Sequence, residues 1–150
     1  MNKEGKNSMS MNRREVRDSA FKILFEYSLR DDSVEELYAL SEEVEEITVN
    51  DAVRQIVDGT VAHLEEIDGI IQKYSPKRVI SRIPSLNLTV MRIAIYEILY
   101  DEGTPANAAV SEALLLAERY TYFAEDIRFI NGLLGAFVRD RKQQEGTDAS

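Results

Sequence analysis

Residues 87–100 read NLTVMRIAIYEILY, and they are the most informative segment for the architecture of the chain. Its apolar side chains fall on nearly every side of a helix instead of forming one stripe. Apolarity all round is typical of a helix that is buried in the middle of a protein. We therefore expect a central helix here, with the other elements packed around it.

The segments on either side of this stretch are also helical in pattern. A 3.6-residue apolar period dominates the chain and alternating stretches are almost absent, which predicts an all-α protein. Towards the C terminus we expect helices over about 107–120 and 125–141. Towards the N terminus a short helical piece at about 78–82 follows a long helix over about 49–72, which Ser75-Pro76 ends.

Two further helices are expected near the N terminus. Asn12 caps the first, which runs to about Leu29, and Ser33 with Glu36 forms a capping box for a short second one. We expect a single domain over residues 12–141, with flexible tails at 1–11 and 142–150. The chain has neither the apolar core of a signal peptide nor an apolar run of about eighteen residues, which favours a cytoplasmic protein.

Some residues of the C-terminal helices cost stability unless the fold compensates for them. Gly132 and Gly135 lie inside the last helix, where each costs roughly 0.8–1 kcal/mol relative to Ala, so we expect close helix packing there.

Arg92, Glu97 and Glu112 lie on otherwise apolar helices. We expect them to form a buried or half-buried ion pair, because a buried charge is costly unless it is paired.

The composition excludes several kinds of active site. The chain has no cysteine and one histidine, His63, which leaves little from which to build a metal site, a thiol nucleophile or a Ser-His-Asp triad. The seven glycines match neither of the two common nucleotide-binding loops. We therefore expect none of these active sites, no cofactor and no metal.

The charges are unevenly distributed along the chain. A net charge of −9 argues against binding nucleic acid over the whole surface. However, residues 31–72 hold thirteen acids and one base, whereas 1–30 hold seven bases and four acids, and 73–100 hold five bases and one acid. Two basic stretches on an acidic protein allow a localised anionic ligand.

The first helix begins with three arginines. Arg13, Arg14 and Arg17 fall in its first turn and a half, where the helix dipole disfavours each cation by roughly 0.3–1 kcal/mol. Arg17, Phe21 and Phe25 form a column at i, i+4 and i+8. Guanidinium groups beside aromatic rings suit single-stranded RNA, and the alternative is a solvated helix start above ordinary core aromatics.

Five blocks of the chain, in order and spacing, resemble the NusB family. Together they cover about residues 12–139. The blocks are RREVRDSAFKILF (13–25), DGTVAHLEEIDGII (58–71), MRIAIYEILYDEGTP (91–105), AAVSEALLLAERY (108–120) and RFINGLLGAF (128–137).

The resemblance implies an all-α fold of about seven helices in two small three-helix bundles. It also implies a non-enzymatic transcription antitermination factor that pairs with NusE, a small-subunit ribosomal protein, and binds the boxA element of nascent RNA. The complex would then join elongating RNA polymerase with other Nus factors, mainly in ribosomal RNA operons.

The resemblance also implies which residues bind. One of the implied RNA-binding residues is an acid at the start of the last helix, Asp126. Glu125 is the alternative for this role, because the loop before the last helix differs in length from the commoner family version. Arg82 and Asn87 fall in the region that meets NusE, where this chain departs from the family pattern. The positions carried over for RNA binding are Arg13, Arg14, Arg17, Phe25, Asp126, Arg128 and Phe129.

Two other functions remain open at this point. The domain could assist an RNA-modifying enzyme on a separate chain, because NusB-like domains also occur fused to RNA cytosine methyltransferases. It could also be a purely structural module that binds NusE or forms a homodimer through its apolar helices and ignores RNA.

Overall fold

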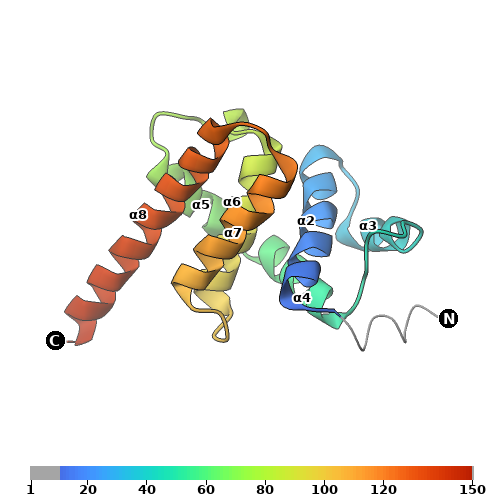
Figure 1. Ribbon diagram of the computed structural model, residues 1–150, viewed down its shortest axis with the longest axis horizontal. Coiled ribbons are helices and arrows are strands. Elements are labelled where there is room, and N and C mark those ends of the chain that lie inside the picture. The colour runs from blue at the N-terminus through green and yellow to red at the C-terminus, as the bar shows by residue number, and fades with distance from the viewer. Residues whose placement is uncertain (1–10, 150) are drawn as a thin grey trace. The chain divides into compact units, whose positions relative to one another are not determined.

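The computed structural model describes residues 11–149, and its ribbon is drawn in Figure 1. Over that range the chain forms seven α-helices and one short 3₁₀ helix, with no strand. This confirms the predicted all-α class. The chain divides into two compact units, Met1–Ala62 and His63–Ser150. None of the described helices is both long and apolar enough to cross a membrane.

The first unit contains α2 (Arg13–Leu29), α3 (Val34–Ser41) and α4 (Asp51–Ala62), with α2 packed against the other two. Both predicted caps are present. The Asn12 side chain accepts a hydrogen bond from the Glu15 amide at 2.9 Å. The Ser33 hydroxyl accepts from the Glu36 amide at 3.2 Å and donates to the Glu36 carboxylate at 3.1 Å. The core is built from Val16, Ala20, Ile23, Leu24, Leu37, Val53, Ile56 and Val57.

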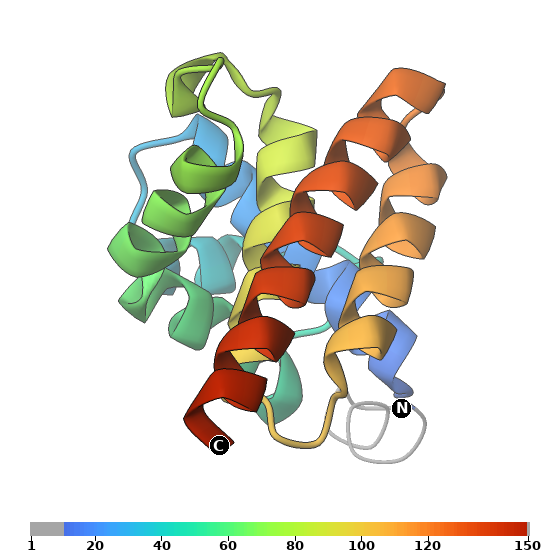
Figure 2. The same cartoon turned by 90° about the vertical axis from the view of Figure 1, so that its left-hand side faces the viewer.

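The second unit contains α5 (Leu64–Tyr74), the 3₁₀ helix η1 (Ile80–Arg82), α6 (Ser85–Tyr100), α7 (Ala106–Tyr120) and α8 (Ala124–Ala149). The predicted central helix is α6, which packs against α5, α7 and α8. Figure 2 shows it between α5 and α7, with α8 crossing in front. Its side chains are buried on several sides, including Val90, Met91, Ile93 and Ile95.

The long helix predicted over 49–72 is wrong, because the chain leaves helical geometry at His63 (φ −110°, ψ 21°). The apolar period continues through this break, with Thr60 buried before it and Ile67 after it, so periodicity did not reveal it. A sequence signal was present nonetheless. Glu65 and Glu66 lie in the first turn of α5, where acids favour a new helix start. With this break the described residues form the seven α-helices that the resemblance implies, four of them in the second unit.

The structure describes most of the region expected as a C-terminal tail, but little of the one expected at the N terminus. The predicted last helix ends near Arg141, whereas α8 continues to Ala149. The tail expected over residues 1–11 lies outside the described residues except for Met11, whose sulfur accepts a hydrogen bond from Asn50 at 3.1 Å.

The two helical glycines do not mark close packing, as the sequence had suggested. A Cβ atom at Gly132 would meet nothing within 4 Å, so the expectation is wrong at this position. A Cβ at Gly135 would meet only the Arg139 Nη1 atom, at 3.3 Å, which is the end of a flexible side chain. Neither helix packing nor backbone conformation therefore requires glycine at Gly132.

Arg92 is paired with a carboxylate, as expected, but the partner is Asp68 of α5, which the sequence did not indicate. The Arg92 guanidinium donates two hydrogen bonds of 2.8 Å to the carboxylate of Asp68 on α5. Both side chains are largely buried, so the pair compensates the cost of placing Arg92 on an apolar helix. Glu97, one turn and a half further along α6, is also buried.

Candidate functional site

The basic start of α2 exposes two of its three arginines. Arg13 and Arg14 are exposed, whereas Arg17 is only 7% exposed. Arg17 is covered because it follows the first buried residue of the helix, Val16. The exposed guanidinium groups at this end of α2 are those of Arg13 and Arg14.

The aromatic column of α2 is only partly accessible. The rings of Phe21 and Phe25 stack with centroids 5.7 Å apart and planes 18° from parallel. Phe21 is 3% exposed and belongs to the core, which agrees with the alternative that these rings are ordinary core aromatics. Phe25 is half-buried, so it is the one ring of the pair that retains an accessible surface.

In the second unit the Asp126 carboxylate accepts hydrogen bonds from residues of two other segments. One oxygen accepts from the Asn87 side-chain amide on α6 at 3.0 Å, and the other accepts from the Thr121 hydroxyl at 2.8 Å. Asn87 is only 1% exposed. These three residues form what we call the Asp126 network. Because both Asp126 oxygens serve the fold, the exposed neighbour Glu125 is the more accessible carboxylate at the start of α8.

Asn87 and Asp126 were assigned from the sequence to different ligands, to NusE and to RNA, and the structure places them in contact. A buried amide cannot touch a partner directly without rearrangement. Within the free protein Asn87 positions Asp126. Arg82, by contrast, is exposed on η1 and open to a partner.

Phe129 contacts the basic segment that connects α5 to α6. The Arg78 guanidinium lies 4.6 Å from the centroid of the Phe129 ring, and Arg128 beside it is exposed. Residues 75–84 carry Lys77, Arg78 and Arg82 and no acid. The α5–α6 connection and the start of α8 lie at the same end of the second unit in both Figure 1 and Figure 2.

Residues that the sequence-based assignment missed lie at this same end. They are Arg78 and the loop Thr121–Tyr122–Phe123 between α7 and α8. The aromatic string YTYF at 120–123 was a visible signal, but nothing in the pattern showed which of its rings would be exposed.

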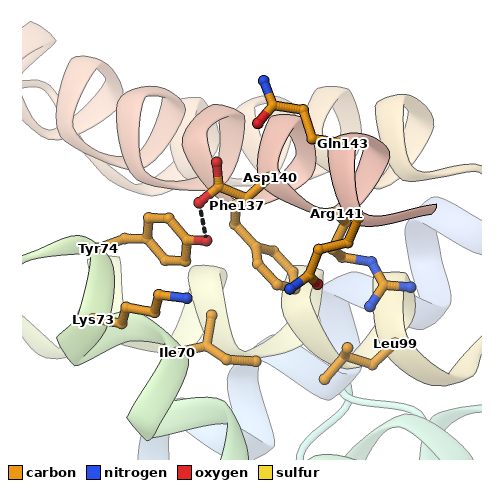
Figure 3. Close-up of a pocket in the computed structure, with 9 residues that line it drawn as sticks. Ile70, Lys73, Tyr74, Leu99, Phe137, Asp140, Arg141 and Gln143 are labelled. Carbon is orange, nitrogen blue, oxygen red and sulfur yellow. Dashed lines mark hydrogen bonds between the residues drawn. The ribbon is translucent and has the colours of Figure 1, made fainter. Parts of the chain in front are cut away.

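A separate hollow of about 610 Å³ lies among α5, α6 and α8 (Figure 3). The Tyr74 hydroxyl donates to Asp140 at 2.5 Å across it. Burial is the larger cause and this hydrogen bond the next, and together they raise the pKa of Tyr74 to about 12. None of the site residues expected from the sequence lines the hollow. Among the described residues, no group of three or more His, Asp or Glu side chains is placed to hold a metal ion.

Comparison with known proteins agrees with the architecture. Residues 14–139 match the model of the NusB family. The transcription antitermination protein NusB of Thermoanaerobacter sp. (strain X514) is 37% identical over 141 residues, which cover 91% of this chain and 96% of the relative.

Solved structures show the same fold. NusB of T. maritima superposes with a TM-score of 0.76 at 30% identity, covering 87% of this chain and 93% of that one. A crystal structure of the antitermination factors NusB and NusE in complex with double-stranded RNA gives a TM-score of 0.75 at 27% identity, covering 85% of this chain and 96% of that one. The chain therefore belongs to the NusB family of all-helical, non-enzymatic proteins.

Proposed function

We propose that this protein is a transcription antitermination factor that binds boxA-type RNA together with NusE. The complex then joins elongating RNA polymerase and other Nus factors, mainly in ribosomal RNA operons, which makes the cytoplasm its place of action. The support is the name shared by the relatives and the similarity to a solved complex of NusB, NusE and RNA.

One observation in the chain itself carries the RNA-binding part of the proposal. Arg13 and Arg14 are exposed at the N-terminal end of α2, where the helix dipole makes cations unfavourable. Stability alone favours acids at these positions. Two exposed guanidinium groups are suited to the phosphates of an RNA backbone, because each presents a planar fork of donors.

The exposed residues at the start of α8 make up the RNA-binding part of the second unit in this proposal. Arg128 contacts phosphate, Phe129 offers part of its ring, and the Asp126 network holds the helix start in place. Arg82 contributes to the surface that meets NusE, and Asn87 acts on that surface from beneath, through Asp126.

The charge of the protein limits how strongly it binds RNA alone. A chain of net charge −9 with few exposed cations at each site neutralises few phosphates. On a single strand, log K falls by about 0.7 per log unit of salt for each phosphate neutralised. We therefore expect weak binding with a shallow salt dependence, and tighter binding when NusE is present.

Fluorescence anisotropy tests the proposal directly. A labelled boxA-like oligoribonucleotide and a scrambled one of the same composition are each titrated with the protein, with and without NusE. The expected result is preference for the boxA-like strand and a lower Kd in the presence of NusE. Equal, NusE-independent affinity for both strands contradicts specific recognition, and binding of NusE without any RNA binding identifies a protein-interaction module instead.

A further inference from the structure

The short loop between α7 and α8 presents two aromatic rings to solvent. Tyr122 is 100% exposed and Phe123, directly after it, is 69% exposed. Every other large apolar side chain in the described part of the chain is less exposed than this pair. Two adjacent exposed aromatic side chains form a contiguous apolar patch, and patches of this kind mark interaction sites.

Hydrogen bonds on both sides hold this loop in shape. The Thr121 amide donates to the Ala117 carbonyl at 3.0 Å, and the Thr121 hydroxyl accepts from the Phe123 amide at 3.2 Å. The same hydroxyl donates to Asp126, whose own amide donates to the Phe123 carbonyl at 3.1 Å. The backbone that carries Tyr122 and Phe123 is thus fixed before any ligand arrives, which reduces the entropy lost on binding.

The Asp126 network is part of this support. Through Asn87 it ties the loop to α6, the central helix of the unit. Asn87 and Asp126 therefore also help to hold the loop with the two exposed rings at the start of α8.

The surroundings of the rings favour nucleobases over lipid or an apolar peptide. Arg128 is exposed near the start of α8, and Arg78 lies over the adjoining Phe129 ring. Glu118 and Glu125 are also exposed on either side of the loop. An anionic backbone is repelled by these acids and attracted by the arginines, so the charges favour phosphates at Arg78 and Arg128 and leave the uncharged rings to the bases. Aromatic side chains beside cations are the usual platform for unpaired bases.

We propose that Tyr122 and Phe123 stack on unpaired bases of the RNA strand whose phosphates contact the neighbouring arginines. This inference rests on the proposed RNA-binding function and adds a ligand-contacting pair to it. It assigns the rings to bases, whereas the basic residues of α2 and α8 are assigned to phosphates.

The test uses the full-length protein and two variants. The first, Tyr122→Ala with Phe123→Ala, removes both rings. The matched control, Tyr122→Phe with Phe123→Tyr, keeps two rings and exchanges only the hydroxyl group. Neither change touches the hydrogen bonds of the loop, which are made by Thr121, Asp126 and the backbone. Thermal unfolding of both variants checks that the fold is retained.

Two readouts separate stacking from charge. The ligand is a boxA-like single strand that carries 2-aminopurine, whose fluorescence is quenched on stacking, and a duplex of the same sequence serves for comparison. We expect the double alanine variant to lose the quenching and to bind the single strand about tenfold or more weakly, with duplex binding little changed. The slope of log K against log salt should remain that of the unmodified protein, because no cation is removed.

The outcomes distinguish this inference from the proposed function. If the unmodified protein binds no RNA in the presence or absence of NusE, the proposed function fails and the inference fails with it. If the protein binds the single strand and the double alanine variant binds it equally well with the same quenching, only the stacking pair is overturned. Loss of NusE binding with unchanged RNA binding also overturns it and assigns the rings to the protein partner.

Discussion

Arg92 on α6 and Asp68 on α5 meet through two parallel hydrogen bonds of 2.8 Å, in which Nε and Nη2 of the guanidinium donate to the two carboxylate oxygens. The Arg92 side chain is 12% exposed and that of Asp68 is 26% exposed. A bidentate pair in this setting is screened from water far more than a surface ion pair. It links the central helix of the second unit to its neighbour.

Removing one partner of this pair should destabilise the protein. Asp68→Ala leaves the guanidinium largely buried without its two acceptors, so we expect the free energy of unfolding to fall by about 2 kcal/mol in urea titrations. Glu65→Ala, at an exposed position of the same helix, is the control and should change it by less than about 0.5 kcal/mol. A double-mutant cycle with Arg92→Met that gives no coupling energy would show that the pair contributes nothing.

Neutralising the two exposed arginines of α2 should weaken RNA binding without lowering stability. For Arg13→Gln with Arg14→Gln we expect the slope of log K against log salt to become shallower by about 1.4, which corresponds to two lost phosphate contacts. The melting temperature should stay level or rise slightly, because the cations oppose the helix dipole. Arg139→Gln with Lys142→Gln removes the same charge from exposed positions of α8 and should leave the slope unchanged. Equal slopes for all three proteins would exclude α2 as the phosphate site.

The stability of the protein should fall at alkaline pH because of Tyr38. Burial, and then the hydrogen bond that its hydroxyl donates to Asp58 at 2.6 Å, raise the pKa of Tyr38 above its ordinary 10.0. Above pH 10 the unfolded chain loses a proton that the folded protein keeps. The free energy of unfolding therefore decreases with rising pH, by up to about 1.4 kcal/mol per pH unit for this group.

Tyr38→Phe should flatten that alkaline decrease. The measurement is urea unfolding across pH 9 to about 11.5, the range over which an ordinary tyrosine ionises. Tyr122→Phe, at a fully exposed side chain, serves as the control and should keep the original slope. An unchanged pH dependence in Tyr38→Phe would assign the effect to other groups.

Gly132→Ala should stabilise the protein. A Cβ at this position meets nothing within 4 Å, so the substitution adds helix propensity without a clash, and we expect a gain of about 0.5–1 kcal/mol in unfolding free energy. Gly135→Ala should gain less, because its Cβ would lie 3.3 Å from the Arg139 guanidinium, which has to move. A loss of stability in Gly132→Ala would mean that the helix is packed on this face after all.

The helices and their caps could be predicted from the sequence because their signals are local. The side chains of Asn12 and Ser33 bond within three residues of themselves, and the apolarity of residues 87–100 is a property of one segment. The break at His63 was missed because the apolar period runs through it without a change of phase. A pattern of this kind reports which face is buried and not whether the backbone between two turns is continuous.

The candidate site was less predictable, because it depends on contacts between distant segments. The pairing of Asn87 with Asp126 spans 39 residues and that of Arg78 with Phe129 spans 51, so no window of sequence contains either. The burial of Arg17 was missed for a related reason. Three arginines in one helical turn and a half look equivalent in sequence, and only packing distinguishes the one that is covered.

The break between α4 and α5 gives the protein a natural spectroscopic marker. His63, the only histidine in the sequence, lies at the break, and its ring stacks on Tyr100 with centroids 4.0 Å apart. In a proton NMR spectrum the two imidazole C–H resonances therefore belong to one known residue, and the tyrosine ring displaces them from their positions in an unfolded chain. Any event that changes the contact between His63 and Tyr100, such as RNA or NusE binding, becomes visible in two resolved lines without isotope labelling or mutation.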